Sequence, residues 1–305
     1  MKRLICAVAL MFGILSTSAV ARDIAHELGT TTVPDAPERI VVLEFSFIDA
    51  LASVGVAPVG IADDNRRDRV IAEYTEIIGD EWVSVGTRKT PSLEVIASLS
   101  PDLIIADKNR HSEAFGTFSE IAPTIVLDSL GGDYHASVEQ MTIIGEAIGK
   151  PEEMATRVAA HKAKMADYVA QIKPKAAGVS AQFGVTNANG LWLHSPVSYN
   201  GSLLEMFGFA SGMSPDGEGG LYEKTYVPTT LEQLSEVNPD ILIFGEYADP
   251  SHVDSWSGET LYEGLTAVEA GKVFNVTAHN WSRLRGMLAA ELTAADIVEI
   301  MGKIE

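Results

Sequence analysis

The chain has 305 residues, of which 46% are hydrophobic and 21% are charged. These are values of a globular protein, and the length allows two domains or one large one. The formal net charge of -20 argues against nucleic acid or an anionic membrane surface as a partner, because like charges repel. An anionic ligand would also be repelled, unless arginines at its binding site reverse the local field.

The start of the chain has the pattern of a secretory signal peptide. Lys2 and Arg3 precede a short apolar run and then small residues that end at Ala21 in an A-x-A pattern. We therefore expect residues 1–21 to be cleaved, which takes the formal charge from -20 to -22. The single cysteine, Cys6, lies inside this leader and away from its cleavage point, so we expect no lipid anchor and no disulfide or thiolate site in the mature chain. These features fit a protein of the bacterial periplasm.

An internal repeat indicates two related lobes. The segment Ser92–Ile105 recurs 138 residues later as Thr230–Ile243. Each copy predicts a short helix that starts after Ser or Thr, a proline that stops it, and an apolar strand of the kind found in parallel sheets. Looser strand and helix patterns alternate before both copies, so the sequence predicts an α/β fold of two Rossmann-like lobes with mainly parallel sheets. The expected strands are 39–43, 103–106, 179–185, 241–244 and 273–276, and the expected lobe helices include 48–54 and 202–207.

A charged segment with helical spacing separates the two halves. Pro151 suits a first helical turn, and apolar residues then recur at helical intervals up to about Lys173. At 1.5 Å per residue this helix would be roughly 34 Å long. An ordinary surface helix is the alternative, but the repeat requires a junction here. We therefore predict an N-terminal lobe (22–150), a connecting helix (151–173) and a C-terminal lobe (174–305), with a ligand cleft between the lobes.

The sequence lacks the patterns of common catalytic and metal sites. It has no G-x-x-x-x-G-K-[ST] phosphate loop, no strand-borne G-x-G-x-x-G and no G-x-S-x-G elbow. The seven histidines show neither H-x-H nor H-E-x-x-H spacing. We therefore expect no catalytic residue, no resident cofactor and no metal held by the protein. A periplasmic enzyme that processes a chelate, such as a reductase or a hydrolase, is the competing class.

Arginines and aromatic residues lie near the ends of the expected strands. Ligands of open α/β sheets bind beyond the carboxyl ends of strands, which is where Arg110, Tyr247 and the segment 281–285 fall. Guanidinium groups match carboxylates in a bidentate manner and stay charged, so this pattern favours an anionic ligand. The predicted ligand-binding residues are Arg88, Arg110, Trp192, Tyr199, Tyr247, Trp281, Arg283 and Arg285.

Some of the aromatic residues and arginines have a structural interpretation that does not involve a ligand. Trp192 and Trp281 fit a core position as well as a binding site. Arg66, Arg67 and Arg69 stand among aspartates and are expected on the solvated surface.

Short segments over nearly the whole mature chain occur in an order typical of one family. They include RIVVLE at 39–44, GIADDN at 60–65, VGTR at 85–88, PSLE at 91–94, PDLIIAD at 101–107 and WSRLRG at 281–286. In these segments the chain resembles the helix-linked, two-lobed periplasmic binding proteins for ferric siderophores and cobalamin. Its nearest likeness is to the branch that binds ferric dicitrate. The match is poorest over 210–227, so ligand contacts from that loop are not assigned.

The resemblance implies a binding protein that delivers an anionic ferric chelate, first of all ferric citrate, to an ABC importer. It implies that the chelator coordinates the iron, while the protein contacts the outer carboxylates and hydroxyls of the chelate and moves little. Another ferric siderophore is the nearest alternative ligand, and haem or cobalamin are more distant ones. We expect the protein to be a monomer.

The resemblance also assigns a role to Glu94 and Glu232, which occupy the same position in the two copies of the repeat. In the family, glutamates at this position pair with arginines on the two permease subunits. The alternative is that each glutamate only complements the dipole of its own helix.

Overall fold

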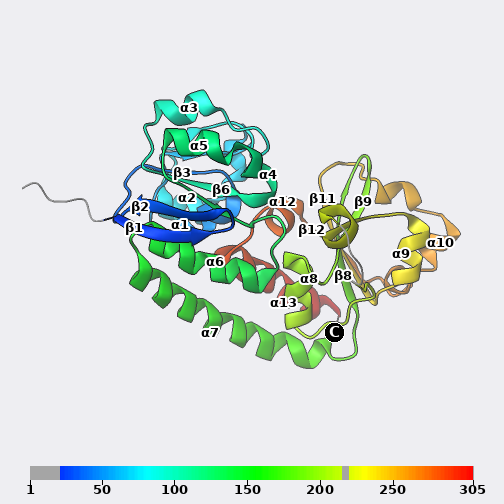
Figure 1. Cartoon of the computed structure of the whole chain (residues 1–305). Helices are drawn as coiled ribbons and strands as arrows, with labels where there is room; N and C mark the ends of the chain where they lie inside the picture. The colour runs from blue at the N-terminus through cyan, green and yellow to red at the C-terminus, as the bar shows by residue number, and fades with distance from the viewer. Residues whose placement is uncertain (1–20, 215–219, 305) are drawn as a thin grey trace, which may run out of the picture.

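The computed structural model describes residues 21–214 and 220–304, which form two α/β lobes and a long helix along one side of both (Figure 1). The sheet of the N-terminal lobe has the order β5-β4-β3-β6-β7, and every pairing is parallel. Its strands are β3 (Ile40–Val42), β4 (Gly60–Ile61), β5 (Val83–Ser84), β6 (Leu103–Asp107) and β7 (Thr124–Leu127). Strands β3, β6 and β7 are buried throughout, as expected of parallel strands covered on both faces.

Helices cover both faces of this sheet. Residues of α3 and α5 pack on one face, and residues of α1 and α6 pack on the other. The hairpin of β1 (Ala21–His26) and β2 (Gly29–Pro34) lies beside the lobe. The helices of this half are α1 (Phe45–Ser53), η1 (Arg67–Arg69), α2 (Ala72–Ile78), α3 (Leu93–Ser98), α4 (Lys108–His111), η2 (Ser112–Ala114), α5 (Phe115–Ile121) and α6 (Tyr134–Ala147).

The sheet of the C-terminal lobe is mixed. Its order is β10-β9-β8-β11-β12, in which β8, β11 and β12 are parallel while β9 and β10 run antiparallel to their neighbours. A short turn joins β8 directly to β9, and a connection this short makes two strands antiparallel. The strands are β8 (Ala181–Asn187), β9 (Gly190–His194), β10 (Tyr226–Thr229), β11 (Ile241–Glu246) and β12 (Val273–Thr277). The helices are α8 (Tyr199–Met206), η3 (Leu221–Thr225), α9 (Leu231–Val237), η4 (Val253–Trp256), α10 (Thr260–Glu263), α11 (Thr266–Glu269), α12 (Ala278–Ser282) and α13 (Met287–Ile304).

The repeat occupies equivalent places in the two lobes. Ser92 caps α3 by accepting a hydrogen bond from the N–H of Val95, and Thr230 caps α9 by accepting one from the N–H of Gln233. The apolar runs that follow form β6 and β11, and each lies between two parallel neighbours. The predicted helix–strand unit is therefore confirmed in both halves.

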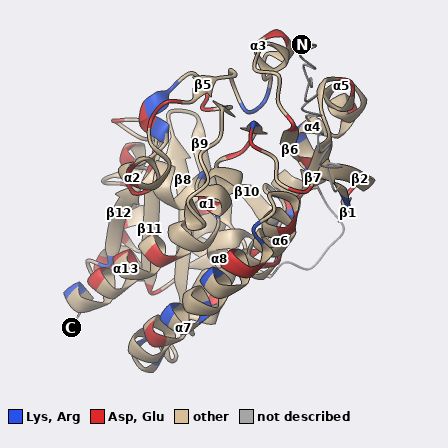
Figure 2. Cartoon of the chain, turned by 90° about the vertical axis from the view of Figure 1, so that its left-hand side faces the viewer, with Lys and Arg blue, Asp and Glu red and all other residues tan. Residues whose placement is uncertain are grey.

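The predicted connecting helix is α7 (Pro151–Ala176), and it extends three residues beyond the expected end. Basic and acidic residues are interspersed along it (Figure 2). The last helix, α13, also joins the lobes, because Met287 belongs to the core of the N-terminal lobe and Ile297 to the core that contains Phe183 of β8. The chain thus returns to the first lobe at the start of α13, and its last described residues pack in the core of the second lobe.

The expected signal peptide lies outside the described residues, except for Ala21, which begins β1. None of the helices in the described part of the chain is long and apolar enough to cross a bilayer.

Candidate functional site

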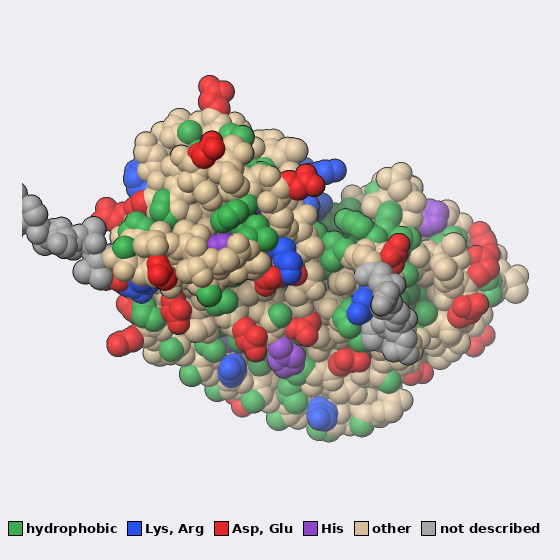
Figure 3. Space-filling model, viewed as in Figure 1, with side chains coloured by type: hydrophobic (Ala, Val, Ile, Leu, Met, Phe, Trp, Pro, Cys, Tyr) green, Lys and Arg blue, Asp and Glu red, His purple; other side chains and the backbone are tan. Residues whose placement is uncertain are grey.

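A pocket of about 490 Å³ lies where the two lobes meet, and the surface is hollowed there (Figure 3). Its wall includes four of the predicted residues, Trp192, Tyr247, Arg283 and Arg285, and one residue of the N-terminal lobe, Leu130. A larger hollow of about 590 Å³ lies beside the edge strand β5, among residues that carry no arginine cluster. The pocket between the lobes is therefore the better candidate site.

Arg283 is held over an aromatic ring on the wall of this pocket. Its guanidinium carbon lies 4.0 Å from the centre of the Tyr247 ring, while the Tyr247 hydroxyl bonds to the carbonyl of Ala278 and to Ser282. Burial, together with the charges of Arg69 and Arg88, lowers the pKa of Arg283 from its ordinary value. Among the described residues, no carboxylate forms an ion pair with Arg283.

Arg285 lies deeper in the same wall and is 3% exposed. It donates a 2.9 Å hydrogen bond to the hydroxyl of Tyr226, which in turn donates a 2.8 Å bond to the carbonyl of Leu130 in the other lobe. Although burial lowers the pKa of Arg285, Tyr226 and Glu44 raise it above its ordinary value. Arg285 thus provides a permanent positive charge at the back of the pocket.

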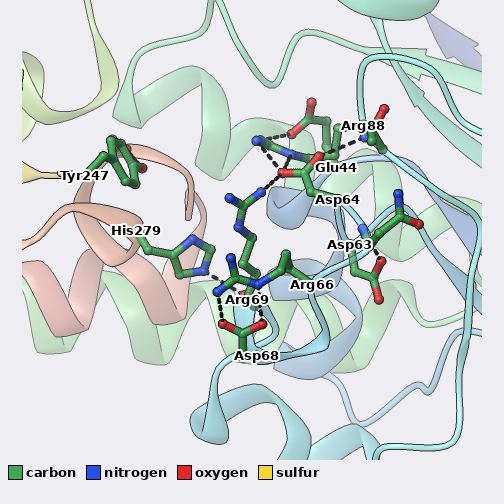
Figure 4. Close-up of polar contacts among 12 residues, drawn as sticks. Glu44, Asp63, Asp64, Arg66, Asp68, Arg69, Arg88, Tyr247 and His279 are labelled. Atoms are coloured by element: carbon green, nitrogen blue, oxygen red, sulfur yellow. Dashed lines mark hydrogen bonds and ion pairs between the residues drawn. The ribbon is translucent and has the colours of Figure 1, made fainter. Parts of the chain in front are cut away.

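The predicted arginines of the N-terminal lobe carry internal counter-ions (Figure 4). Arg88 lies 3.1 Å from a carboxylate oxygen of Glu44 and 3.0 Å from one of Asp64. The Nε atom of Arg110 lies 2.5 Å from the second oxygen of Glu44. The buried ring of His111 fixes this arrangement, because its Nε2–H donates to the carbonyl of Arg88 at 2.8 Å. The residues that line the pocket include neither arginine, and both arginines are already paired with a carboxylate.

Glu44 is the buried centre of this group, with 1% of its surface exposed. Burial raises its pKa, but the charges of Arg88 and Arg110 outweigh burial and hold the pKa below its ordinary value. Nearby, burial and the charge of Glu44 raise the pKa of Asp107 to about 6. Asp107 also accepts hydrogen bonds from the N–H groups of Ser129 and Leu130, and so shapes the loop at the pocket edge.

Arg69 does not lie free on the solvated surface as expected. It forms a 2.6 Å ion pair with Asp64, and its carbonyl accepts a 2.6 Å hydrogen bond from Nε2 of His279 in the other lobe. Burial lowers the pKa of His279 to about 4, so the ring is neutral at physiological pH. The close-up shows His279 and Tyr247 facing the arginine group from the C-terminal lobe (Figure 4). Arg66, in contrast, is exposed and pairs with Asp68 as the sequence suggested.

Tyr199 and Trp281, both predicted ligand contacts, lie in the core instead. Each is 1% exposed, and their polar atoms bond to the carbonyl of Gly286 and to the carboxylate of Asp296. They therefore support the segment that carries Arg283 and Arg285 rather than line the pocket. The local sequence does not distinguish an aromatic residue that lines a pocket from one that packs in the core.

Sequence reasoning missed Glu44, Asp64, Tyr226 and His279. For Glu44 and Asp64 a signal existed, because Glu44 follows β3 closely and Asp64 follows β4 closely, at the carboxyl edge where ligands of parallel sheets bind. Tyr226 and His279 approach from the other lobe, and nothing in their local sequence indicates that contact. Within 21–214 and 220–304, no three His, Cys, Asp or Glu side chains gather to hold a metal ion.

Glu94 and Glu232 lie exposed in the first turns of α3 and α9, one on each lobe. The hydrogen bond between Thr230 and the N–H of Gln233 is 3.3 Å long, as is the bond between Ser92 and Val95. Both carboxylates are exposed, and hydrogen bonds from its own backbone N–H and from Thr230 lower the pKa of Glu232.

Comparisons with known proteins show which proteins the chain is similar to. The chain is 41% identical over 283 residues to the Fe(3+) dicitrate-binding periplasmic protein FecB of Escherichia coli, covering 92% of this chain and 91% of that protein. It is 38% identical over 286 residues to the Fe(3+)-citrate-binding protein YfmC of Bacillus subtilis, covering 93% and 87%. The structure of Staphylococcus aureus SirA complexed with staphyloferrin B matches with a TM-score of 0.78 at 23% identity, covering 92% of this chain and 98% of SirA. The model of the family described as "Periplasmic binding protein" matches residues 40–279, so this chain belongs to the periplasmic binding protein family.

Proposed function

We propose that this protein is the monomeric receptor of an iron-chelate importer, and that it binds ferric citrate in the cleft between its lobes. The observation that carries the proposal is the pair Arg283 and Arg285, which lie in an aromatic pocket without a carboxylate partner among the described residues. Such a pair is costly to hold in a folded protein unless an anion completes it. The names of the relatives FecB and YfmC support ferric citrate as that anion.

Recognition in this proposal depends on the outer surface of the chelate. Arg283 and Arg285 bind its outward carboxylates, and Trp192 and Tyr247 contact its carbon skeleton. In this proposal, citrate supplies the ligands of the iron, and the protein contributes none. The protein has no catalytic role and leaves the chelate unchanged.

Delivery in this proposal takes place in the periplasm, after the signal peptide has been removed. Glu94 and Glu232 dock the loaded protein on the permease subunits of an ABC importer, one glutamate on each lobe. The net charge of the mature chain, which is -22 once Lys2 and Arg3 are removed, keeps the receptor away from anionic lipid, so the contact is made by these sites and not by general attraction.

Quenching of tryptophan fluorescence tests the ligand, because Trp192 lines the pocket. The purified mature protein is titrated with ferric citrate, with a ferric hydroxamate and with iron-free citrate, and the recovered ferric citrate is examined by mass spectrometry. We expect the tightest binding for ferric citrate and an unchanged chelate. Preference for the hydroxamate would replace citrate with another siderophore, and equal affinity for iron-free citrate or a chemically altered chelate would contradict the proposal.

A further inference from the structure

A buried carboxylate, Glu44, lies within the group of arginines at the junction of the two lobes. Glu44 contacts Arg88 at 3.1 Å and Arg110 at 2.5 Å, and Arg285 of the other lobe is close enough to lower the pKa of the Glu44 carboxyl as well. Because Glu44 is 1% exposed, solvent and salt screen its charge poorly. An anionic ligand in the pocket is therefore repelled by Glu44 while it is attracted by the arginines.

The carboxylate of Glu44 does not stabilise the start of its helix. Glu44 stands at the N-cap position of α1, yet its side chain makes no capping hydrogen bond. In the described part of the chain, its side-chain polar contacts are those with Arg88 and Arg110. Asp64 likewise forms ion pairs with Arg88 at 3.0 Å and with Arg69 at 2.6 Å. Two carboxylates thus partly neutralise the arginine cluster that we define as Arg69, Arg88, Arg110, Arg283 and Arg285.

This arrangement divides the cluster into two parts. The arginines of the N-terminal lobe are each paired with Glu44 or Asp64, whereas Arg283 and Arg285 are left to the ligand. A ligand with more carboxylates than the unpaired arginines can match must compete with Glu44 for Arg88 and Arg110. The internal carboxylates therefore limit how much negative charge the cleft accepts.

We propose that Glu44, assisted by Asp64, is a specificity-determining residue that acts as a built-in counter-ion and sets the net charge of chelate that the cleft accepts. This inference rests on the proposed binding of an anionic ferric chelate. Glu44 holds the affinity for the chelate below the maximum that the arginines could reach. The lower affinity also favours release of the ligand to the importer.

The test is the isosteric substitution Glu44→Gln, which removes the charge and keeps the shape. Affinity for ferric citrate is measured by isothermal titration calorimetry at three concentrations of NaCl. We expect Glu44→Gln to bind ferric citrate about tenfold more tightly than the wild type, since one like charge is removed from a poorly screened site. We also expect its affinity to fall more steeply with salt, because the net positive charge of the cluster is greater.

Three further variants separate charge from packing and folding. Glu44→Asp keeps the charge and should show the salt dependence of the wild type, whatever its affinity. Glu120→Gln removes an exposed carboxylate of α5 outside the cluster and should change neither quantity. Asp64→Asn lies at a less buried position and should act in the same direction as Glu44→Gln, so the proposal remains testable if Glu44→Gln does not fold.

The outcomes are distinct. Weaker binding of ferric citrate by both Glu44→Gln and Asp64→Asn, with an unchanged salt dependence, would show that these carboxylates only position arginines and would overturn the inference alone. Unchanged affinity in both variants would overturn it as well. Failure of the wild type to bind ferric citrate or any other anionic ferric chelate would overturn the proposed function together with the inference.

Discussion

The carboxylate of Asp49, in the first helix of the N-terminal lobe, accepts a 2.7 Å hydrogen bond from the N–H of Met287, the first residue of α13. It also accepts from the N–H groups of Leu288 and Ala289 at 3.2 and 2.9 Å, and from the hydroxyl of Tyr74. One buried side chain of the first lobe thus satisfies the start of a helix whose other end packs on the second lobe. The contact helps to hold the two walls of the cleft in one arrangement.

Replacement of Asp49 should therefore weaken the whole molecule. In Asp49→Ala, three N–H groups at the start of α13, two of them buried, lose their acceptor, and we expect the free energy of unfolding to fall by at least about 2 kcal/mol. Urea unfolding followed by circular dichroism measures this change. Asp167→Ala, at an exposed position of α7, is the control and should change stability by less than about 0.5 kcal/mol. Equal stability of the two variants would contradict the role of Asp49.

The unpaired arginine of the pocket should matter most for binding. We expect Arg283→Ala to weaken the binding of ferric citrate by about 1.5 to 3 kcal/mol, because a charge-assisted contact is lost. Arg110→Ala should cost less, since Arg110 is already paired with Glu44. Titration calorimetry compares both with Arg66→Ala, an exposed arginine paired with Asp68, which should bind as the wild type does. A larger loss in Arg110→Ala than in Arg283→Ala would reverse our ranking.

The two equivalent glutamates should affect transport but not ligand binding. In the double variant Glu94→Ala and Glu232→Ala, we expect uptake of iron citrate by cells to fall sharply, with a smaller loss in each single variant, because both lobes lose their contact with the permease. Chelate affinity and folding should stay near those of the wild type. Glu236→Ala, at an exposed position of the same helix α9, is the control for loss of an acidic residue. Normal uptake by the double variant at equal protein levels would rule out the docking role.

The ion-pair group around Glu291 should make stability depend on pH. Burial raises the pKa of Glu291, but hydrogen bonds from His161, Lys164 and Arg157 outweigh it and lower the pKa to about 2. A folded-state pKa below the unfolded value stabilises the protein above the unfolded pKa, and this contribution is lost as the pH falls through the folded value. Glu291→Gln should therefore reduce the free energy of unfolding at pH 7 by roughly 2 to 3 kcal/mol.

Urea unfolding at a series of pH values measures this dependence. The difference between the wild type and Glu291→Gln should narrow from about pH 5 downward and nearly vanish by about pH 2. Glu299→Gln, which removes an exposed carboxylate from the same helix, should differ little from the wild type at any pH. A constant difference down to pH 2 would show that Glu291 acts by packing alone.

The elements of each lobe could be predicted from the sequence because their signals are local. The repeat placed α3 with β6 and α9 with β11, and Gly55 and Gly208 follow α1 and α8 with φ of 69° and 96°, where glycine is favoured. The run from Pro151 predicted α7 because proline fits the first helical turn and apolar residues recur along one face. Arg283 and Tyr247 were predicted because they follow expected strands, and the carboxyl ends of parallel strands meet at one edge of a sheet. Trp192, which also lines the pocket, lies inside β9.

Only the tertiary structure decided how these residues are used. Tyr199 and Trp281 have the residue types of a binding site, yet α8 and α12 turn them into the core. The pairing of Arg88 with Glu44 joins residues 44 positions apart in the chain, and the bond between His279 and Arg69 joins residues 210 apart. The local sequence indicates secondary-structure propensity and the periodic pattern of buried residues. It does not indicate which distant charged residue a buried arginine will pair with. The pairing of Arg88 with Glu44 is decided when distant loops of the N-terminal lobe pack together, and the bond between His279 and Arg69 is decided when the two lobes meet.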